Sequence, residues 1–189
     1  FSGEENGLWG SNYFAKNPTV ELSSVNYMIN MDMVGRLNEE NSLAVYGVGT
    51  SPSFPSILDP INSDSLKIVT TESGVGPSDH TSFYLHDLPV LHFFTGQHED
   101  YHKPSDDSDK INYDGLVKVV RYISRAITQL DAEPKLAFTK TKDSSDSPRF
   151  TVSMGVVPDY MYDGKGMRVD GVSEGKPAQA AGLLKGDVV

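Results

Sequence analysis

Three near-continuous apolar runs constrain the fold of this chain more than any other feature. They cover residues 27–34, 43–48 and 89–94. A strand covered on both faces carries such a run, whereas a strand with one wet face alternates apolar and polar residues. We therefore predict three buried strands.

Helical patterns lie before, between and after these runs. They occupy residues 8–15, 54–61, 79–85 and 113–130. In the last segment apolar residues recur at three- and four-residue steps and form one stripe, and Ser78 is the expected N-cap of the third. Alternating strands and helices predict an α/β fold, a three-layer sandwich with a mostly parallel central sheet.

A change of composition divides the chain. Residues 132–149 are rich in Lys, Thr, Ser, Asp and Pro, which is typical of a linker. We predict one domain over residues 1–131 and a second, partial and β-rich domain over residues 150–189. Alternating residues at 150–157, a further expected strand at 167–172 and a short helix at 177–181 support the second.

Composition excludes several classes of function. With 26 acidic and 16 basic residues the formal charge is −10, which argues against a nucleic-acid partner. No apolar run has the roughly 18 to 20 residues that a membrane span needs. Because the chain has no cysteine, any metal must be held by histidines and carboxylates. The chain begins at Phe1 without an initiator Met, and we expect it to be a fragment of a longer protein.

Three acidic residues stand at unusual places. Glu4 and Glu5 are adjacent where an apolar stretch gives way to a glycine-rich turn, and Asp32 interrupts an apolar run. Acids at such places bind metals or move protons, because a buried carboxylate must be paired or metal-bound. The alternatives are a helix N-terminus for the pair, where the helix dipole favours acids, and turn capping or pairing with Arg36 for Asp32.

The polar loop after the third run holds two histidines. His98 and His102 are four positions apart, but Gly96 and Pro104 oppose a helix that would place both on one face. We expect at most one of them to bind a metal, and simple solvent exposure is the alternative for each. Ligands in open α/β sheets gather beyond the carboxyl ends of strands, so acids and an imidazole that follow apolar stretches predict a divalent metal site, with zinc favoured.

At this point the chain resembles a known family, the co-catalytic zinc aminopeptidases of clan MH, which are related to bacterial leucyl aminopeptidases and more distantly to glutamate carboxypeptidase and glutaminyl cyclase. The resemblance covers residues 1–131. It rests on four motifs in order, FSGEE at 1–5, NMDMVG at 30–35, SDHTSF at 78–83 and YHKPSD at 101–106.

The resemblance implies roles for particular residues. Glu4 would be the general base, Glu5 and His102 would share one zinc ion, and Asp32 would bind the second. Asp79 and Asp106 would orient these ligands. The implied substrates are peptides with a free N-terminus. The family pattern also needs an upstream histidine and a bridging aspartate that this chain lacks, so we expect the chain alone to bind metal weakly and to be inactive.

Residues 154–160 and 175–189 resemble the start of a PDZ domain, which binds a peptide terminus as an added strand. The resemblance and this attached piece imply a periplasmic or extracellular protein. Two other functions remain open from the sequence: a single-zinc enzyme like glutaminyl cyclase, and a non-catalytic scaffold with a PDZ peptide-binding module.

Overall fold

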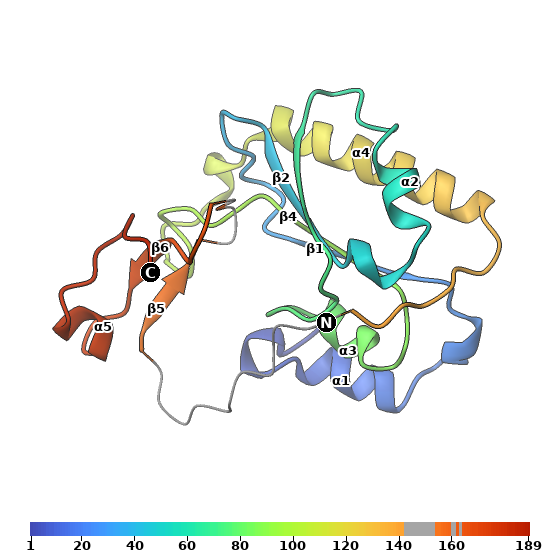
Figure 1. Ribbon diagram of the computed structural model, residues 1–189, viewed down its shortest axis with the longest axis horizontal. Coiled ribbons are helices and arrows are strands. Elements are labelled where there is room, and N and C mark those ends of the chain that lie inside the picture. The colour runs from blue at the N-terminus through green and yellow to red at the C-terminus, as the bar shows by residue number, and fades with distance from the viewer. Residues whose placement is uncertain (142–153, 160–161, 163) are drawn as a thin grey trace. The chain divides into compact units, whose positions relative to one another are not determined.

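The computed structural model describes residues 1–141, 154–159, 162 and 164–189, and the chain divides into two compact units, Phe1–Asp143 and Ser144–Val189 (Figure 1). The first unit contains, in chain order, η1 (Glu4–Asn6), α1 (Trp9–Lys16), η2 (Leu22–Ser24), β1 (Met28–Asp32), β2 (Ser42–Tyr46), η3 (Val48–Thr50), α2 (Phe54–Leu58), β3 (Lys67–Thr71), α3 (His80–Tyr84), β4 (Val90–Phe94), η4 (Ser108–Lys110) and α4 (Tyr113–Ala132).

A four-stranded mixed sheet in the order β1-β4-β2-β3 forms the centre of this unit. β1 is parallel to β4 and β2 is parallel to β3, whereas β2 and β4 are antiparallel. The register pairs Met28 with Val90 at one end and Asp32 with Phe94 at the other. Because β1 and β4 are parallel, the segments that follow them leave the sheet at the same edge.

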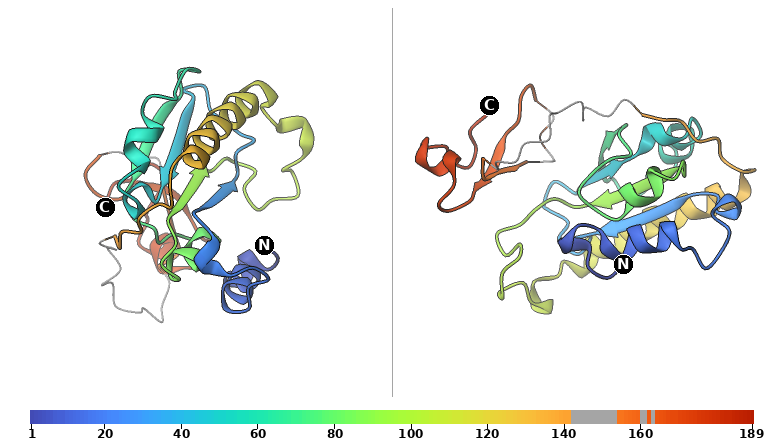
Figure 2. Two further views of the ribbon diagram at one scale, coloured as in Figure 1. Left: turned by 90° about the vertical axis from the view of Figure 1, so that its right-hand side faces the viewer. Right: turned by 90° about the horizontal axis from the view of Figure 1, so that it is seen from below.

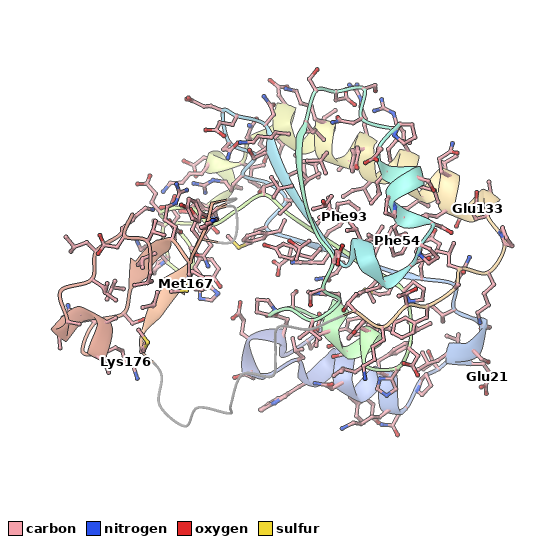
Figure 3. All side chains as sticks on the ribbon, in the orientation of Figure 1. Glu21, Phe54, Phe93, Glu133, Met167 and Lys176 are labelled. Atoms are coloured by element: carbon pink, nitrogen blue, oxygen red, sulfur yellow. The ribbon has the colours of Figure 1, made fainter. Side chains whose placement is uncertain are left out.

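β4 is buried on both faces, which explains its continuous apolar run. Leu91 and Phe93 join the core that includes α2 and α4, and Val90 joins the core that includes α3 and Phe14 of α1. Phe54 of α2 and Phe93 of β4 are both fully buried, and they belong to the same core (Figure 3). Helices therefore cover both faces of the sheet, and Figure 2 shows β1 between α1 and α4. The predicted α/β fold with a mostly parallel sheet is confirmed.

Two features of the first unit differ from the prediction. β3 was not predicted, because this edge strand contains Lys67 and Thr70 and is largely half-buried or exposed, so it lacks an apolar run. Ser78 is not the N-cap of α3, because Asp79 occupies that position without a side-chain capping bond. The Ser78 hydroxyl donates to Asp32 instead.

Residues 133–141, within the predicted linker, are part of the first unit and pack onto its core. Leu136 is buried in the main core, and its N–H donates to Asn26 Oδ1 at 2.7 Å. Thr139 N–H donates to the Thr50 carbonyl oxygen at 2.9 Å. The rest of the predicted linker, residues 142–149, lies outside the described residues.

The second unit contains β5 (Val156–Pro158), β6 (Val169–Val172) and α5 (Pro177–Ala180), with β5 and β6 antiparallel. Residues 150–153 of the strand predicted at 150–157 lie outside the described residues, and residues 156–157 belong to β5. Within the described part of the chain, no helix has the length and apolar character needed to cross a membrane.

Candidate active site

The segments that follow β1 and β4 meet at one edge of the sheet. Asp32 is the last residue of β1, and its register partner Phe94 is the last residue of β4. Just beyond them, Thr95 Oγ1 donates a hydrogen bond to the Met33 carbonyl oxygen. Parallel pairing therefore places Asp32 beside the start of the loop that carries His102.

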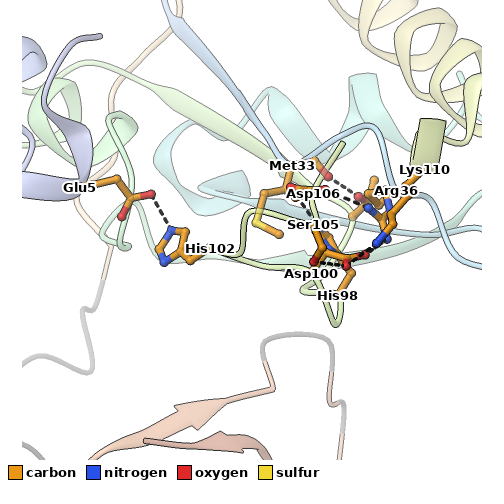
Figure 4. Close-up of polar contacts among 10 residues, drawn as sticks. Glu5, Met33, Arg36, His98, Asp100, His102, Ser105, Asp106 and Lys110 are labelled. Atoms are coloured by element: carbon orange, nitrogen blue, oxygen red, sulfur yellow. Dashed lines mark hydrogen bonds and ion pairs between the residues drawn. The ribbon is translucent and has the colours of Figure 1, made fainter. Parts of the chain in front are cut away.

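Glu5 and His102 meet although 97 positions separate them in the sequence. His102 Nε2 lies 2.8 Å from Glu5 Oε1 (Figure 4). Both side chains are accessible, with 69% of Glu5 and 53% of His102 exposed. Glu5 belongs to the short 3-10 helix η1, and His102 belongs to the loop between β4 and η4. A carboxylate and an imidazole that face each other at the surface can pair or can bind a cation between them.

Glu4 lies in a group of carboxylates. Burial raises the pKa of Glu4 most, and the charges of Glu5, Asp32 and Asp79 raise it further, while a hydrogen bond with Ser78 lowers it. Glu4 therefore keeps its proton to a higher pH than an ordinary glutamate. A carboxyl group with a raised pKa is a better proton acceptor near neutral pH, which is the property a general base needs.

A chain of polar side chains supports Asp32. Ser78 Oγ donates to Asp32 Oδ2 at 3.1 Å, and Asn30 Nδ2 donates to Ser78 Oγ at 2.8 Å. Asn30 Nδ2 also lies 2.9 Å from His92 Nδ1, so His92 accepts at that nitrogen and carries its proton on Nε2. Sequence reasoning did not find these supports, because Asn30 and His92 become neighbours only when β1 pairs with β4.

The two acids predicted to orient the ligands make other contacts. Asp79 Oδ2 accepts from the Phe1 amine at 2.8 Å, and Asp106 Oδ1 accepts from Arg36 Nη1 at 2.9 Å. Neither forms a hydrogen bond with a predicted zinc ligand in the described part of the chain. Their orienting role stays a prediction.

The loop histidines separate in space. His98 Nε2 lies 3.7 Å from Asp106 Oδ2, whereas His102 pairs with Glu5. Arg36 pairs with Asp100 and Asp106 and not with Asp32. The alternative interpretation, in which Asp32 forms an ion pair with Arg36, is therefore wrong.

The described residues do not form a complete metal site. Across residues 1–141 and the described stretches beyond them, no three His, Asp or Glu side chains converge closely enough to hold a metal ion. Glu5 and His102 are ligand types that zinc takes. A catalytic zinc ion usually has three protein ligands. The pair therefore matches zinc in ligand type and is one ligand short of such a site.

Comparison with known families identifies the first unit. The model of peptidase family M28 matches residues 1–127. The chain belongs to peptidase family M28. The range that matches the M28 model holds every predicted site residue and ends within α4. A search of curated proteins found no match.

Solved aminopeptidase structures resemble this M28 chain. The aminopeptidase from Aneurinibacillus sp. strain AM-1 is 27% identical with a TM-score of 0.55, over 74% of this chain and 33% of that one. BSAP, a zinc aminopeptidase from Bacillus subtilis, is 26% identical with a TM-score of 0.58, over 75% and 36%. LapA of Legionella pneumophila shares the fold at 21% identity and a TM-score of 0.55, over 69% and 38%. The M28 chain thus spans about a third of the length of these proteins.

Proposed function

We propose that these residues belong to a zinc-dependent aminopeptidase that hydrolyses the N-terminal bond of peptides. The contact between Glu5 and His102 carries the proposal, because it brings a carboxylate and an imidazole from distant segments to 2.8 Å. His102 belongs to the loop that follows the carboxyl end of β4, and α/β enzymes bind ligands beyond the carboxyl ends of their strands. Membership of family M28 and the likeness to aminopeptidases support it.

Each side chain has a separate role in this proposal. Glu5 and His102 hold one zinc ion, and Asp32, supported by Ser78, contributes to a second. Zinc in such sites supplies a water of lowered pKa and polarises the carbonyl under attack. Glu4 takes up a proton on its carboxylate and passes it to the leaving amine, and its raised pKa favours the uptake.

The activity is proposed for the whole protein. The described residues offer two ligands to one ion and one ligand to the other, and the resemblance implies that a further histidine and a bridging aspartate complete the set. The 189-residue chain alone would then hold zinc weakly and turn over little substrate.

We also propose that residues 150–189 form part of a PDZ-like module and that the protein works in the periplasm or outside the cell. The antiparallel pair β5–β6 and the short helix α5 support the module, and its ligand would be a peptide terminus. Fluorescence polarisation with labelled peptides that end in a free carboxylate tests this, and no saturable binding by the whole protein would refute it.

Replacing Glu4 tests the peptidase. In the whole protein, Glu4→Gln is expected to lower kcat for a leucyl anilide by about 10²–10⁴-fold and to leave the zinc content unchanged. Glu39→Gln, which alters an exposed glutamate between β1 and β2, is the control and should keep full activity. Retained hydrolysis in Glu4→Gln would remove Glu4 from its role. Cyclisation of an N-terminal glutamine without hydrolysis would indicate a cyclase, and a protein without zinc would indicate a scaffold.

A further inference from the structure

Asp100 is a buried carboxylate within a polar loop. It is only 5% exposed. Its Oδ1 accepts hydrogen bonds from Lys110 Nζ at 2.5 Å and Ser105 Oγ at 2.7 Å, and its Oδ2 accepts from Arg36 Nη2 at 2.9 Å (Figure 4). These donors, Lys110 first, hold the pKa of Asp100 well below its usual range. A carboxylate with three donors, two of them cationic, is strongly held in one orientation.

The cluster ties together segments that are separate in the sequence. Arg36 lies in the segment after β1, and Lys110 is the last residue of η4, which leads into α4. Arg36 Nη1 also pairs with Asp106 Oδ1 at 2.9 Å. Because Asp100 and Asp106 flank His102 in the chain, the loop is anchored on both sides of this histidine.

His102 has few contacts of its own that would hold it in place. Its side chain is half exposed, and its backbone has a φ of 55°, in the left-handed region that disfavours side chains with a Cβ. In the described part of the chain its ring pairs with Glu5 and stacks on Tyr101, with centroids 3.8 Å apart. Exposed ion pairs stabilise little, so the contact with Glu5 is too weak to impose this backbone.

We propose that Asp100 is a positioning residue for His102. Through Arg36 and Lys110 it fixes the backbone around His102 and thereby places the imidazole against Glu5. The hydrogen bonds of the Asp100 carboxylate go to Arg36, Ser105 and Lys110 and not to His102 or Glu5, so Asp100 acts through the loop. The inference deepens the proposed function, and its consequence for zinc rests on that function.

The first test needs no metal. It compares the 189-residue chain with Asp100→Asn, which keeps the shape and removes the charge, and with Asp64→Asn, which removes a carboxylate that pairs with Arg125 of α4 at 2.6 Å. NMR measures the nuclear Overhauser effect between the His102 ring and Glu5, and the amide order parameters of residues 99–106. We expect wild type and Asp64→Asn to show the Overhauser effect and order parameters of about 0.85, and Asp100→Asn to lose the effect and fall below about 0.6.

The second test follows the His102 ring resonances during titration with zinc chloride. The apparent affinity should fall roughly 10-fold or more in Asp100→Asn and stay unchanged in Asp64→Asn. If Asp100→Asn keeps the Overhauser effect and an ordered loop, the inference is overturned whatever zinc does. If zinc fails to shift the His102 resonances in wild type, the assignment of His102 as a zinc ligand fails, and the metal-free test still decides the inference. Should Asp100→Asn not fold, Lys110→Met removes one donor only, and the same outcomes apply to it.

Discussion

Two stacked histidines predict that the first unit loses stability in mild acid. His80 of α3 is fully buried and His92 of β4 is 5% exposed, and their rings stack with centroids 4.4 Å apart. Burial, with the charge of His92 adding to it, lowers the pKa of His80 to about 3. Burial also lowers the pKa of His92 to about 4, against the opposing effect of Asp32. Both imidazoles have a pKa of about 6.5 in an unfolded chain.

The unfolded chain therefore binds more protons than the native one below about pH 6.5, so stability that is present above this pH is lost as the pH falls toward the native pKa values. At about pH 5, roughly 1.5 units below the unfolded pKa, each histidine lowers the free energy of unfolding by about 2 kcal/mol relative to pH 7.5. The pair together lowers it by about 4 kcal/mol. Ordinary domains have about 5–15 kcal/mol of stability in total. The effect is large enough to measure.

Urea unfolding at these two pH values, followed by circular dichroism in the presence of EDTA, measures the loss. In His80→Asn the loss of unfolding free energy between the two pH values should be only about 2 kcal/mol, because one buried histidine of the pair remains. His86→Asn removes an exposed histidine and is the control, with an expected loss equal to wild type. The comparison separates the pair from His98, whose pKa is lowered by burial first and by Arg36 next. A wild-type loss under about 1 kcal/mol, or an equal loss in His80→Asn, would refute the reasoning.

The remaining predictions concern the core, a turn and the metal. Phe93→Ala should lower the free energy of unfolding by about 3–5 kcal/mol, whereas Val117→Ala on the exposed face of α4 should change it by less than about 0.5 kcal/mol; equal effects in urea melts would contradict this. Gly47→Ala should lower the free energy of unfolding by more than about 2 kcal/mol, because a Cβ there would lie 2.3 Å from the Val90 carbonyl oxygen. Gly7→Ala is the control and should lower it clearly less, because φ is also positive there but the nearest atom is 3.8 Å away. Calorimetric titration of the 189-residue chain with zinc should show weak binding, and two tight sites would count against the proposed ligand set.

The elements of the fold could be predicted where a residue's surroundings follow from its sequence neighbours. β4 is apolar at every position except His92, so its burial on both faces is visible in the sequence, and the stripe of α4 repeats at helical spacing. β3 could not be predicted in the same way. As an edge strand that starts at Lys67 it has no apolar run, and it becomes a strand by pairing in parallel with β2.

The candidate site divides along a similar line. Glu4, Glu5 and His102 were predicted from residue type and motif, but Asp100 in the same loop looks like an ordinary solvated acid. It is buried because Arg36 reaches it from the segment after β1, which the parallel pairing with β4 brings alongside.

The sequence by itself determined which chemical groups each segment offers and which segments could be strands or helices, because both depend on residues that are close in the chain. Only the tertiary structure decided which groups meet. A contact such as that between Glu5 and His102, 97 positions apart, depends on strand order, direction and register, and these are set by packing across the whole unit.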